Sequence, residues 1–261
     1  MRFAKWHGLG NDYLLIERVD AGRPLDPEAV RRLCDYHRGV GADGVLEVVK
    51  VAGPHAEIVI WNPDGSTAEL SGNGTRIAAR WLARRAGAQE VTVAVGLRQV
   101  LARMRDGLEV ETEMGRVDVG PQETIDVDGE PVELTPVSVG NPHAVIRRDP
   151  DRAEVVRLGP LVERHPRFPE RTNVQFVRVD GLHDVTAVVW ERGARETLAS
   201  GTSACAVAAM AVARGWCESP VTVHLPGGDL LVELDEDLGA RLIGPAQEIC
   251  TGEVSDELGI G

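Results

Sequence analysis

The sequence contains one pattern twice, half a chain length apart, and this internal echo constrains the fold more than any other feature. Residues 58–72 read IVIWNPDGSTAELSG, and 129 positions later residues 187–201 read AVVWERGARETLASG. In each copy an apolar run ends in tryptophan, and a serine followed by glycine lies ten positions further on. Self-similarity at this scale indicates a duplicated domain, because the repeats of solenoid proteins are far shorter.

The echo continues outside these two blocks. GNDYLLI at residues 10–16 matches GNPHAVI at 140–146, and VTV occurs at 91–93 and again at 221–223. All these offsets lie within one residue of 130, half of the 261-residue chain. We therefore predict two similar halves, residues 1–118 and 119–261, each near the usual domain size. The linker is expected within residues 120–136, and the C-terminal strand is free to cross to the first half.

Each half has the sequence pattern of an α/β unit. Strands are predicted at residues 13–19, 45–51, 57–61, 91–95, 100–104 and 108–113, and again at 144–147, 174–179, 184–190, 221–225, 230–234 and 240–243. Helices are predicted at residues 27–37, 73–86, 152–163 and 202–215. Residues 204–213 are apolar on most faces, which is typical of a helix buried in its own domain. We expect an α/β (α+β) fold of two pseudosymmetric domains, each a barrel-like curved sheet around a central helix.

Composition and charge exclude several classes of partner. The net charge of −13 at pH 7 argues against nucleic acid, which needs clustered cations. No apolar stretch approaches the roughly 20 residues that cross a bilayer, and the N-terminus lacks the apolar core of a signal peptide. We therefore expect a cytoplasmic protein with no membrane partner. The four cysteines show no metal-binding spacing, so we expect no metal site and predict buried free thiols at Cys34, Cys205, Cys217 and Cys250.

Ser71 and Ser200 each stand where a loop enters an alanine-rich helix. The glycines that follow, Gly72 and Gly201, let the backbone approach a ligand closely. The N–H groups of a helical first turn have no partner within the helix, and they form a site for a carboxylate or phosphate. Either serine alone is equally well explained as an N-cap. The symmetric pair, each serine ten residues after a tryptophan, favours a functional role.

Further polar residues in turn-like segments have an ordinary explanation beside a functional one. Asn11 and Asn141 follow glycines ahead of strands, and asparagine and glycine both favour turns. Asn62 and Asn173 are equally compatible with turns, and Glu191-Arg192 is compatible with a surface ion pair.

Taken together, these segments resemble the diaminopimelate epimerase family. The matching motifs are KWHGLGNDY at residues 5–13, GADG at 41–44, NPDGSTAELSGNGTR at 62–76, GNPHAV at 140–145, FPERTNV at 168–174, WERG at 190–193 and LPGG at 225–228. They span nearly the whole chain in family order. The resemblance implies an isomerase that interconverts LL- and meso-diaminopimelate without a cofactor, in the lysine and peptidoglycan precursor pathway. It also implies a small amino-acid substrate and a possible homodimer.

The family's mechanism, as the resemblance implies it, uses one cysteine at the helix N-terminus of each half. One thiolate removes the α-proton, and the other thiol delivers a proton to the opposite face. This chain has Ser71 and Ser200 at those positions. A thiol pKa of about 8.5 can be lowered by a helix N-terminus, whereas a hydroxyl is far less acidic. Cys205 lies more than a helical turn further on and is expected to face the core.

Other residues are carried over by their matching motifs. Those expected around the distal and α-amino ends of the substrate are Asn11, Asn62, Asn141, Asn173, Glu191 and Arg192. Those whose backbone would hold carboxylate oxygens are Gly72, Asn73, Gly201 and Thr202. His143 and Glu191 match the residues that the family places beside its two thiols. In this chain they would neighbour Ser71 and Ser200, and would act as bases or activate the hydroxyls.

Three explanations of the serines remain open. In the first, they are cysteine-to-serine substitutions made to trap a complex. In the second, they are natural, and His143 and Glu191 carry a changed reaction such as isomerisation or dehydration. In the third, they mark a protein that binds an amino acid without turning it over. The leading hypothesis is a diaminopimelate epimerase-like protein. The alternatives are a related racemase or isomerase and a non-catalytic amino-acid-binding homologue.

Overall fold

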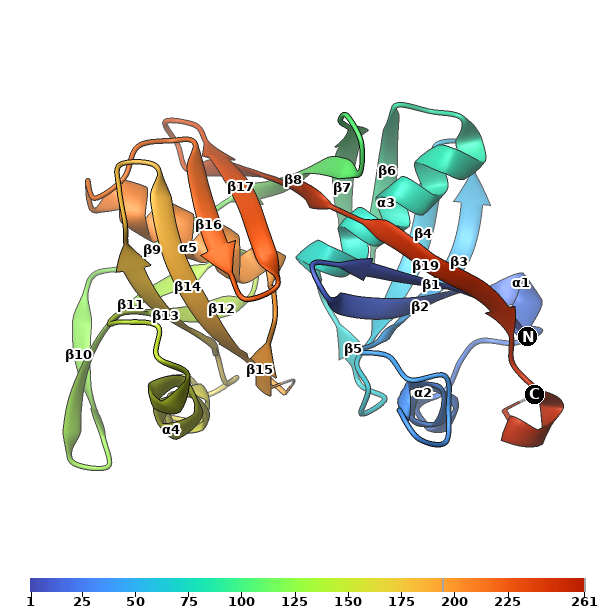
Figure 1. Cartoon of the computed structure of the whole chain (residues 1–261), viewed down its shortest axis with the longest axis horizontal. Coiled ribbons are helices and arrows are strands. Elements are labelled where there is room, and N and C mark those ends of the chain that lie inside the picture. The colour runs from blue at the N-terminus through green and yellow to red at the C-terminus, as the bar shows by residue number, and fades with distance from the viewer. Residues whose placement is uncertain (194, 261) are drawn as a thin grey trace. The chain divides into compact units, whose positions relative to one another are not determined.

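The computed structural model describes residues 1–193 and 195–260, and these form two compact units. The N-terminal unit contains residues 1–112 and 244–261, and the C-terminal unit contains residues 113–243. Both chain ends therefore belong to the N-terminal unit (Figure 1). Ala194, inside the second copy of the repeated block, and Gly261 lie outside the described residues.

The N-terminal unit is built from strands around one long helix (Figure 1). Its strands are β1 (Arg2–Gly8), β2 (Asn11–Glu17), β3 (Val45–Ala52), β4 (His55–Trp61), β5 (Thr67–Ala68), β6 (Glu90–Val95), β7 (Arg98–Met104), the first part of β8 (Glu109–Arg116) and β19 (Gln247–Glu253). Its helices are α1 (Arg18–Ala21), α2 (Pro27–Cys34), α3 (Gly72–Ala86) and a short 3-10 turn η1 (Asp256–Leu258).

The C-terminal unit is likewise built from strands and helices of its own. Its strands are β9 (Asp118–Val119), β10 (Glu123–Val127), β11 (Glu130–Ser138), β12 (Pro142–Arg147), β13 (Asn173–Val179), β14 (Asp184–Glu191), β15 (Arg195–Thr197), β16 (Val221–Leu225), β17 (Gly228–Leu234) and the first part of β18 (Gly239–Pro245). Its helices are α4 (Arg152–Glu163) and α5 (Gly201–Ala213).

Strand pairing follows one scheme in both units. β1–β2, β3–β4, β6–β7 and β7–β8 are antiparallel, whereas β2–β3 and β4–β6 are parallel. Likewise β11–β12, β13–β14, β16–β17 and β17–β18 are antiparallel, whereas β12–β13 and β14–β16 are parallel. The fold class is therefore mixed α/β with mixed sheets, and the order of parallel and antiparallel pairs is repeated between the units.

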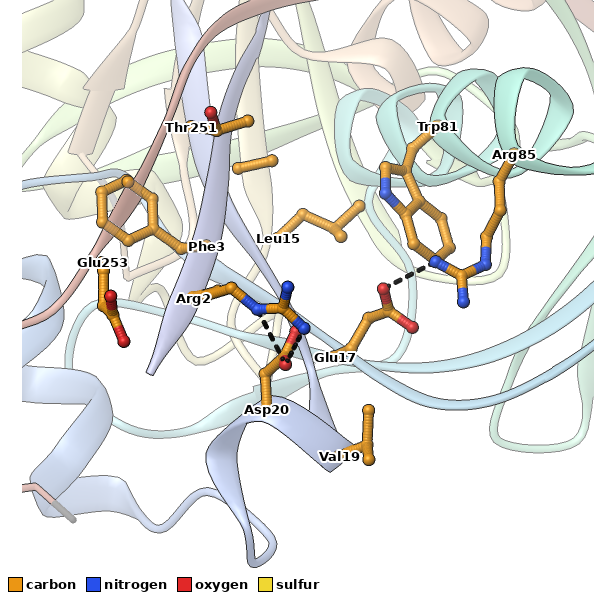
Figure 2. A pocket seen from close by; sticks show the side chains of 12 residues that line it. Arg2, Phe3, Leu15, Glu17, Val19, Asp20, Trp81, Arg85, Thr251 and Glu253 are labelled. Atoms are coloured by element: carbon orange, nitrogen blue, oxygen red, sulfur yellow. Dashed lines mark hydrogen bonds and ion pairs between the residues drawn. The ribbon is translucent and has the colours of Figure 1, made fainter.

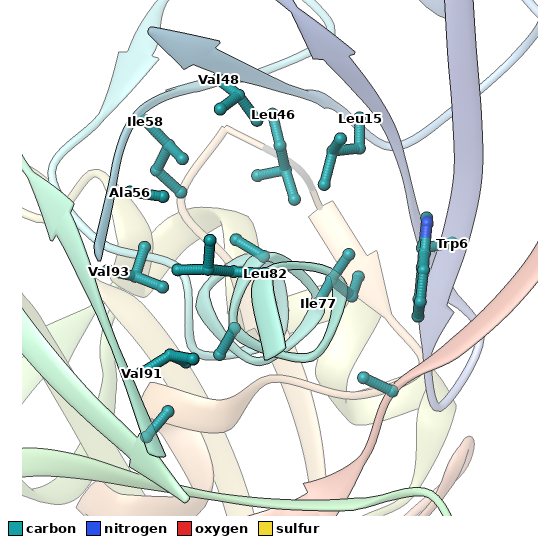
Figure 3. Packing of buried hydrophobic residues seen from close by; sticks show 14 of the residues in the cluster. Trp6, Leu15, Leu46, Val48, Ala56, Ile58, Ile77, Leu82, Val91 and Val93 are labelled. Carbon is teal, nitrogen blue, oxygen red and sulfur yellow. The ribbon is translucent and has the colours of Figure 1, made fainter. Parts of the chain in front are cut away.

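Helix α3 forms the centre of the N-terminal core. It packs against β1, β2, β4, β6 and β7, and Figure 3 shows it end-on with apolar strand residues on several sides. Ile77 and Leu82 of the helix meet residues such as Trp6, Leu46 and Ile58, all essentially excluded from solvent. Burying a side chain of this size contributes about 1.5–3 kcal/mol. This shared core fixes the helix within its unit, and with it the loop that enters the helix at Ser71.

Helix α5 is buried more completely. Every residue from Gly201 to Ala211 is buried, and the helix packs against β9, β11, β12, β13, β14, β16 and β17. The sequence prediction of a helix buried in its own domain is confirmed. Cys205 is fully buried, as expected for a residue one turn past the helix start.

Several boundaries agree with the sequence prediction and others do not. Helix α4 has the predicted bounds, and Asp26 caps α2 by accepting a hydrogen bond from the Ala29 backbone. The predicted linker at residues 120–136 is wrong, because β10 and β11 form a hairpin there inside the C-terminal unit. Strands β1 and β19 were not predicted. They pair with each other although they lie near opposite ends of the chain, and β1 also pairs with the adjacent strand β2.

The cysteine prediction is correct for three of the four thiols. All four are free, and Cys34, Cys205 and Cys217 are buried, but Cys250 is exposed because it lies on the mostly exposed strand β19. Among the described residues, no helix is long and apolar enough to cross a membrane.

Candidate active site

Ser71 is the N-cap of α3, and its hydroxyl has two partners. Its Oγ accepts a hydrogen bond from the Gly74 backbone N–H at 3.0 Å, and it lies 3.0 Å from the Tyr13 hydroxyl. Tyr13 reaches this position across Gly44, where an added Cβ would lie only 2.6 Å from the tyrosine ring. The absence of a side chain at position 44 therefore gives the ring its place. Backbone N–H and phenol groups both suit a negative charge at position 71.

Two predicted ligand-binding amides, Asn11 and Asn73, contact each other in the N-terminal unit. The Asn73 amide nitrogen donates to Asn11 Oδ1 at 3.0 Å, and both side chains are buried. Arg76 donates to Asn73 Oδ1 at 2.7 Å, and Asn11 donates to Asp43 Oδ2 at 3.0 Å. The structure thus brings Asn11 and Asn73 together at the start of α3, with Gly72 buried beside them.

Asn62 is placed differently. Its amide nitrogen donates to Ser66 Oγ at 3.0 Å, and its backbone N–H donates to the Ser66 carbonyl. These contacts are those of a turn residue. Trp61, which precedes it, donates its indole N–H to the buried Glu47 carboxylate at 3.0 Å, and this bond holds the end of β4.

Ser200 has a different partner from Ser71. Its hydroxyl donates to Glu191 Oε2 at 3.1 Å and makes no capping bond to α5. Thr197 donates to the other carboxylate oxygen, Oε1, at 2.6 Å. Glu191 is therefore held by two hydroxyl groups, one on each oxygen. The prediction that placed Glu191 beside a serine hydroxyl agrees with this geometry.

The loop that carries Glu191 is fixed by a second carboxylate. Trp190 donates its indole N–H to Glu163 Oε2 at 2.8 Å, and the Gly193 backbone N–H donates to Glu163 Oε1 at 3.3 Å. In each unit, the tryptophan of the repeated block therefore donates to a buried glutamate. Glu163 comes from α4, whereas Glu47 comes from β3.

His143 is buried, and both of its ring nitrogens are occupied. Gln175 donates to Nδ1 at 2.9 Å, so the ring proton lies on Nε2, which donates to Asn141 Oδ1 at 2.9 Å. Burial, and then the positive charge of Arg192, lower the pKa of His143 to about 3. The imidazole is neutral at pH 7, and it orients Asn141 rather than holding a proton for transfer.

Asn173 links three segments of the C-terminal unit. Its Oδ1 accepts from the Arg192 backbone N–H at 2.9 Å, and its amide nitrogen donates to the Pro142 carbonyl at 3.2 Å. The Arg192 guanidinium donates to the Glu170 carbonyl at 3.1 Å. Asn141 lies 3.5 Å from Thr202 Oγ1, at the buried first turn of α5 with Gly201. Seven predicted residues, Asn141, His143, Asn173, Glu191, Arg192, Gly201 and Thr202, thus lie near one another around Ser200.

Two pockets of similar size have different relations to these residues. One, of about 580 Å³, is lined by Asn141 and His143 together with Phe168 and Glu170. The other, of about 590 Å³, lies on the N-terminal unit and is lined by Trp81 and by the ion pairs Arg2–Asp20 and Arg85–Glu17 (Figure 2). None of the predicted site residues is among the described residues that line this second pocket. Residues 1–193 and 195–260 contain no cluster of three or more His, Cys, Asp or Glu side chains suited to a metal ion.

Comparison with known proteins gives one consistent result. The family model for diaminopimelate epimerase matches residues 3–120 and 135–249. The diaminopimelate epimerase of Desulfitobacterium hafniense is 37% identical, over 98% of this chain and 99% of the relative. Diaminopimelate epimerase 2 of a Nostoc species is 39% identical, over 99% of this chain and 97% of the relative. The chain belongs to the diaminopimelate epimerase family.

The solved structures support the same fold. A probable proline racemase from Agrobacterium radiobacter superimposes with a TM-score of 0.75, covering 97% of this chain and 92% of the other, at 20% identity. The likeness at this identity concerns the fold. Members of the epimerase family are isomerases that act on an amino-acid substrate.

Sequence analysis missed several residues of these clusters. Tyr13 was quoted within a family motif but was given no role, although the internal echo offered a signal, since it stands two residues after Asn11 as His143 stands two after Asn141. Gln175 and Thr197 gave no such signal. Their roles depend on which strands are paired. Gln175 lies on β13, which pairs with the strand that carries His143, and Thr197 lies on β15, which pairs with the strand that carries Glu191.

Proposed function

We propose that this chain binds diaminopimelate as an epimerase-like protein whose two proton-transfer positions carry serine. The proposal treats residues 1–118 and 119–261 as duplicated halves, each supplying one helix N-terminus. In the mechanism that the family resemblance implies, one half supplies a base and the other an acid. The observation that carries the proposal is the full-length family match together with Ser71 and Ser200 at the first turns of α3 and α5.

The hydrogen-bonding groups around these helix starts support an amino-acid ligand. The first-turn N–H groups of α3 and α5 can donate hydrogen bonds to carboxylate oxygens. Asn11, Asn73, Asn141, Asn173, Glu191 and Arg192 offer amide, carboxylate and guanidinium groups for the ammonium and carboxylate ends. Because this set offers partners for a second pair of ammonium and carboxylate groups, it favours diaminopimelate over a simple amino acid. Asn62 is kept in this set as a weaker member, because its amide is bonded to Ser66.

Serine hydroxyls cannot hold a useful population of conjugate base near neutral pH. A helix N-terminus stabilises a negative charge by up to about 2 kcal/mol, or roughly 1.5 pKa units. That brings a thiol of pKa about 8.5 near neutrality and leaves a hydroxyl far above it. We therefore propose that the chain binds its substrate and epimerises it very slowly or not at all.

The direct test combines binding with proton exchange. At a hundredfold excess over its dissociation constant, diaminopimelate is expected to raise the free energy of unfolding by roughly 2.7 kcal/mol. Lysine, which lacks the second carboxylate, is the matched control and should stabilise the protein less. No effect of diaminopimelate beside a clear effect of another amino acid would move the assignment to that amino acid.

A second function is favoured by one observation, the Glu191 carboxylate held by Ser200 and Thr197. Glu191 is a candidate base for a changed reaction, whereas His143 is neutral with both ring nitrogens bonded. In D₂O this function predicts slow exchange of the α-proton that Glu191→Gln abolishes. Absence of exchange in the unaltered protein, with binding intact, would leave the non-catalytic homologue as the better description.

We further propose that the protein acts as a homodimer in the cytoplasm and needs no cofactor. Sedimentation of the purified chain at micromolar concentration tests whether it is a homodimer. Binding assays with extensively dialysed protein test whether it needs a cofactor.

A further inference from the structure

Arg76 is a buried cation that the fold itself does not require. Its side chain is 0% exposed near the start of α3, and burying an ionised group is expensive unless hydrogen bonds compensate. The position 129 residues later on α5 is Cys205, also fully buried. The repeated helix thus forms without an arginine at this place. The arginine must serve something particular to the N-terminal unit.

The guanidinium folds back to the start of its own helix. Its Nη1 donates to the Gly72 carbonyl at 3.2 Å, and its Nη2 donates to Asn73 Oδ1 at 2.7 Å. Helical side chains tilt toward the N-terminus, which makes this return possible. Gly8 leaves room for it, since a Cβ there would lie 3.2 Å from Nη2.

From Arg76 a chain of hydrogen bonds runs through two amides to a carboxylate. Asn73 donates to Asn11, and Asn11 donates to Asp43, each at 3.0 Å. Asp43 is held independently, because its oxygens also accept from the Asp12 backbone at 3.1 Å and from the Tyr36 hydroxyl at 3.0 Å. Lys5 in turn pairs with Asp12 at 2.7 Å.

The two ends of this chain set its direction. A guanidinium only donates, so Arg76 must face the oxygen of Asn73, whose nitrogen then points to Asn11. An ionised carboxylate only accepts, so Asp43 must face the nitrogen of Asn11. Both ends demand the same orientation of both amides. We propose that Arg76 and Asp43 are positioning residues that fix which way the Asn11 and Asn73 carboxamides face a ligand.

The consequence for binding rests on the proposed function, in which Asn11 and Asn73 contact the amino-acid substrate. A carboxamide turned by half a rotation presents an acceptor in place of a donor. A hydrogen bond to a charged group is worth about 1.5–3 kcal/mol, so losing the orientation should weaken binding by roughly ten- to a hundredfold.

The test compares Arg76→Met with Arg76→Lys, which keeps a cation that only donates. Arg80→Met is the matched control, because Arg80 lies one turn further along α3 and donates to the carbonyls of Ala246 and Gly107 outside the amide chain. Hydrogen exchange of the side-chain amides, followed by NMR without ligand, should accelerate at both Asn73 and Asn11 in Arg76→Met. It should stay as in the unaltered protein in Arg80→Met. Acceleration at Asn73 alone, or at neither, would overturn the proposal.

Ligand binding gives the second readout. Diaminopimelate affinity should fall about ten- to a hundredfold in Arg76→Met, less in Arg76→Lys and not at all in Arg80→Met. Equal losses in Arg76→Met and Arg80→Met would contradict a positioning role. If Arg76→Met does not fold, Asp43→Asn tests the other end of the hydrogen-bonded chain, because an asparagine at position 43 can pair with either orientation of the Asn11 carboxamide. Failure of the unaltered protein to bind diaminopimelate would sink the proposed function, while the exchange measurement still decides the amide chain.

Discussion

The first turns of α3 and α5 begin with the same residue and have opposite hydrogen-bond polarity. At α3 the Ser71 oxygen accepts from the Gly74 backbone and meets a phenol, Tyr13. At α5 the Ser200 hydroxyl donates to the Glu191 carboxylate and leaves the helix uncapped by a side chain. The repeated strand pattern places Ser71 and Ser200 at corresponding helix starts, and neighbouring side chains make the two positions chemically different. Position 71 suits a group that carries negative charge, and position 200 suits a group that keeps its proton.

The difference arises from two substitutions within the internal echo. Tyr13 stands where the other half has His143, and Asn62 stands where it has Glu191. In the C-terminal unit the histidine turns to Asn141 and Gln175, which leaves the carboxylate as the partner of the serine. In the N-terminal unit Asn62 turns to Ser66, which leaves the phenol and the backbone as partners. The two helix starts thus differ in whether the serine oxygen accepts a hydrogen bond from its own helix or the hydroxyl donates one to a carboxylate.

The largest effect is expected from introducing thiols at both helix starts. Ser71→Cys with Ser200→Cys should raise the rate of diaminopimelate epimerisation by orders of magnitude, because thiols can be tuned toward neutral pKa values and hydroxyls cannot. Either single change should help little, since both faces of the α-carbon must be served, so the effects are strongly non-additive. The measurement is α-proton exchange with stereochemical analysis of the product.

Leu97→Cys, at a fully exposed turn residue, is the matched control for adding a thiol and should leave the rate unchanged. Turnover of about 1–1000 per second by the unaltered protein would contradict this account of the chemistry.

The next effect concerns His143, which occupies in one half the place of Tyr13 in the other. Burial lowers its pKa to about 3, below the value of about 6.5 in the unfolded chain. The unfolded state then binds the proton more readily, so its contribution to stability is complete above pH 6.5 and lost as the pH falls toward 3. Between pH 6.5 and 5 the free energy of unfolding should drop by roughly 2 kcal/mol.

Urea unfolding of His143→Gln and of the unaltered protein at both pH values isolates this loss. His55→Gln, at an exposed position, is the control. His224 acts with the opposite sign, because hydrogen bonding to Asp229 raises its pKa and its contribution is lost as the pH rises through that value. A His143→Gln variant with the same pH dependence as the unaltered protein would show that the buried imidazole does not set it.

The internal echo and local patterns were enough to predict the repeated α/β units and the two central helices, and the family resemblance was needed to expect Glu191 beside a serine. These depend on local pattern or on positions next to a strong motif. The sequence was insufficient where long-range pairing decides. The partners β1 and β19 lie at opposite ends of the chain, and the hairpin at residues 120–136 contains proline and glycine that resemble a linker. The bonds of Gln175 and Asp43 depend on register between strands and loops, which no local pattern reveals.

A more direct measure of the polarity difference is the acidity of thiols placed at the two helix starts. The thiol introduced by Ser71→Cys should have the lower pKa, because backbone N–H and phenol donors stabilise a thiolate. The thiol introduced by Ser200→Cys should have the higher pKa, because the Glu191 charge opposes ionisation. We expect a difference of about one pKa unit or more, measured by the pH dependence of thiolate absorbance in each single variant.

Glu191→Gln in the Ser200→Cys background removes the opposing charge, so it should lower the pKa of that thiol. The absorbance of the thiols already present, such as the exposed Cys250, is measured in the unaltered protein and subtracted. Equal pKa values at the two positions would remove the basis for assigning them different roles.

The smallest effect tests the cap itself. Ser71→Ala removes the side-chain bond to the Gly74 N–H and should lower the free energy of unfolding by about 1 kcal/mol, the usual value of an N-cap. Ser200→Ala removes no capping bond, but it takes one of two hydroxyl donors from Glu191. Its loss should therefore shrink when the Glu191 charge is removed by Glu191→Gln, whereas the loss from Ser71→Ala should not. Denaturant titrations of both variants at pH 7.5, with and without Glu191→Gln, make the comparison, with the exposed Thr67→Ala as the control. An equal loss from Ser200→Ala in both backgrounds would mean that its hydroxyl acts like that of Ser71, and the contrast between the two helix starts would fail.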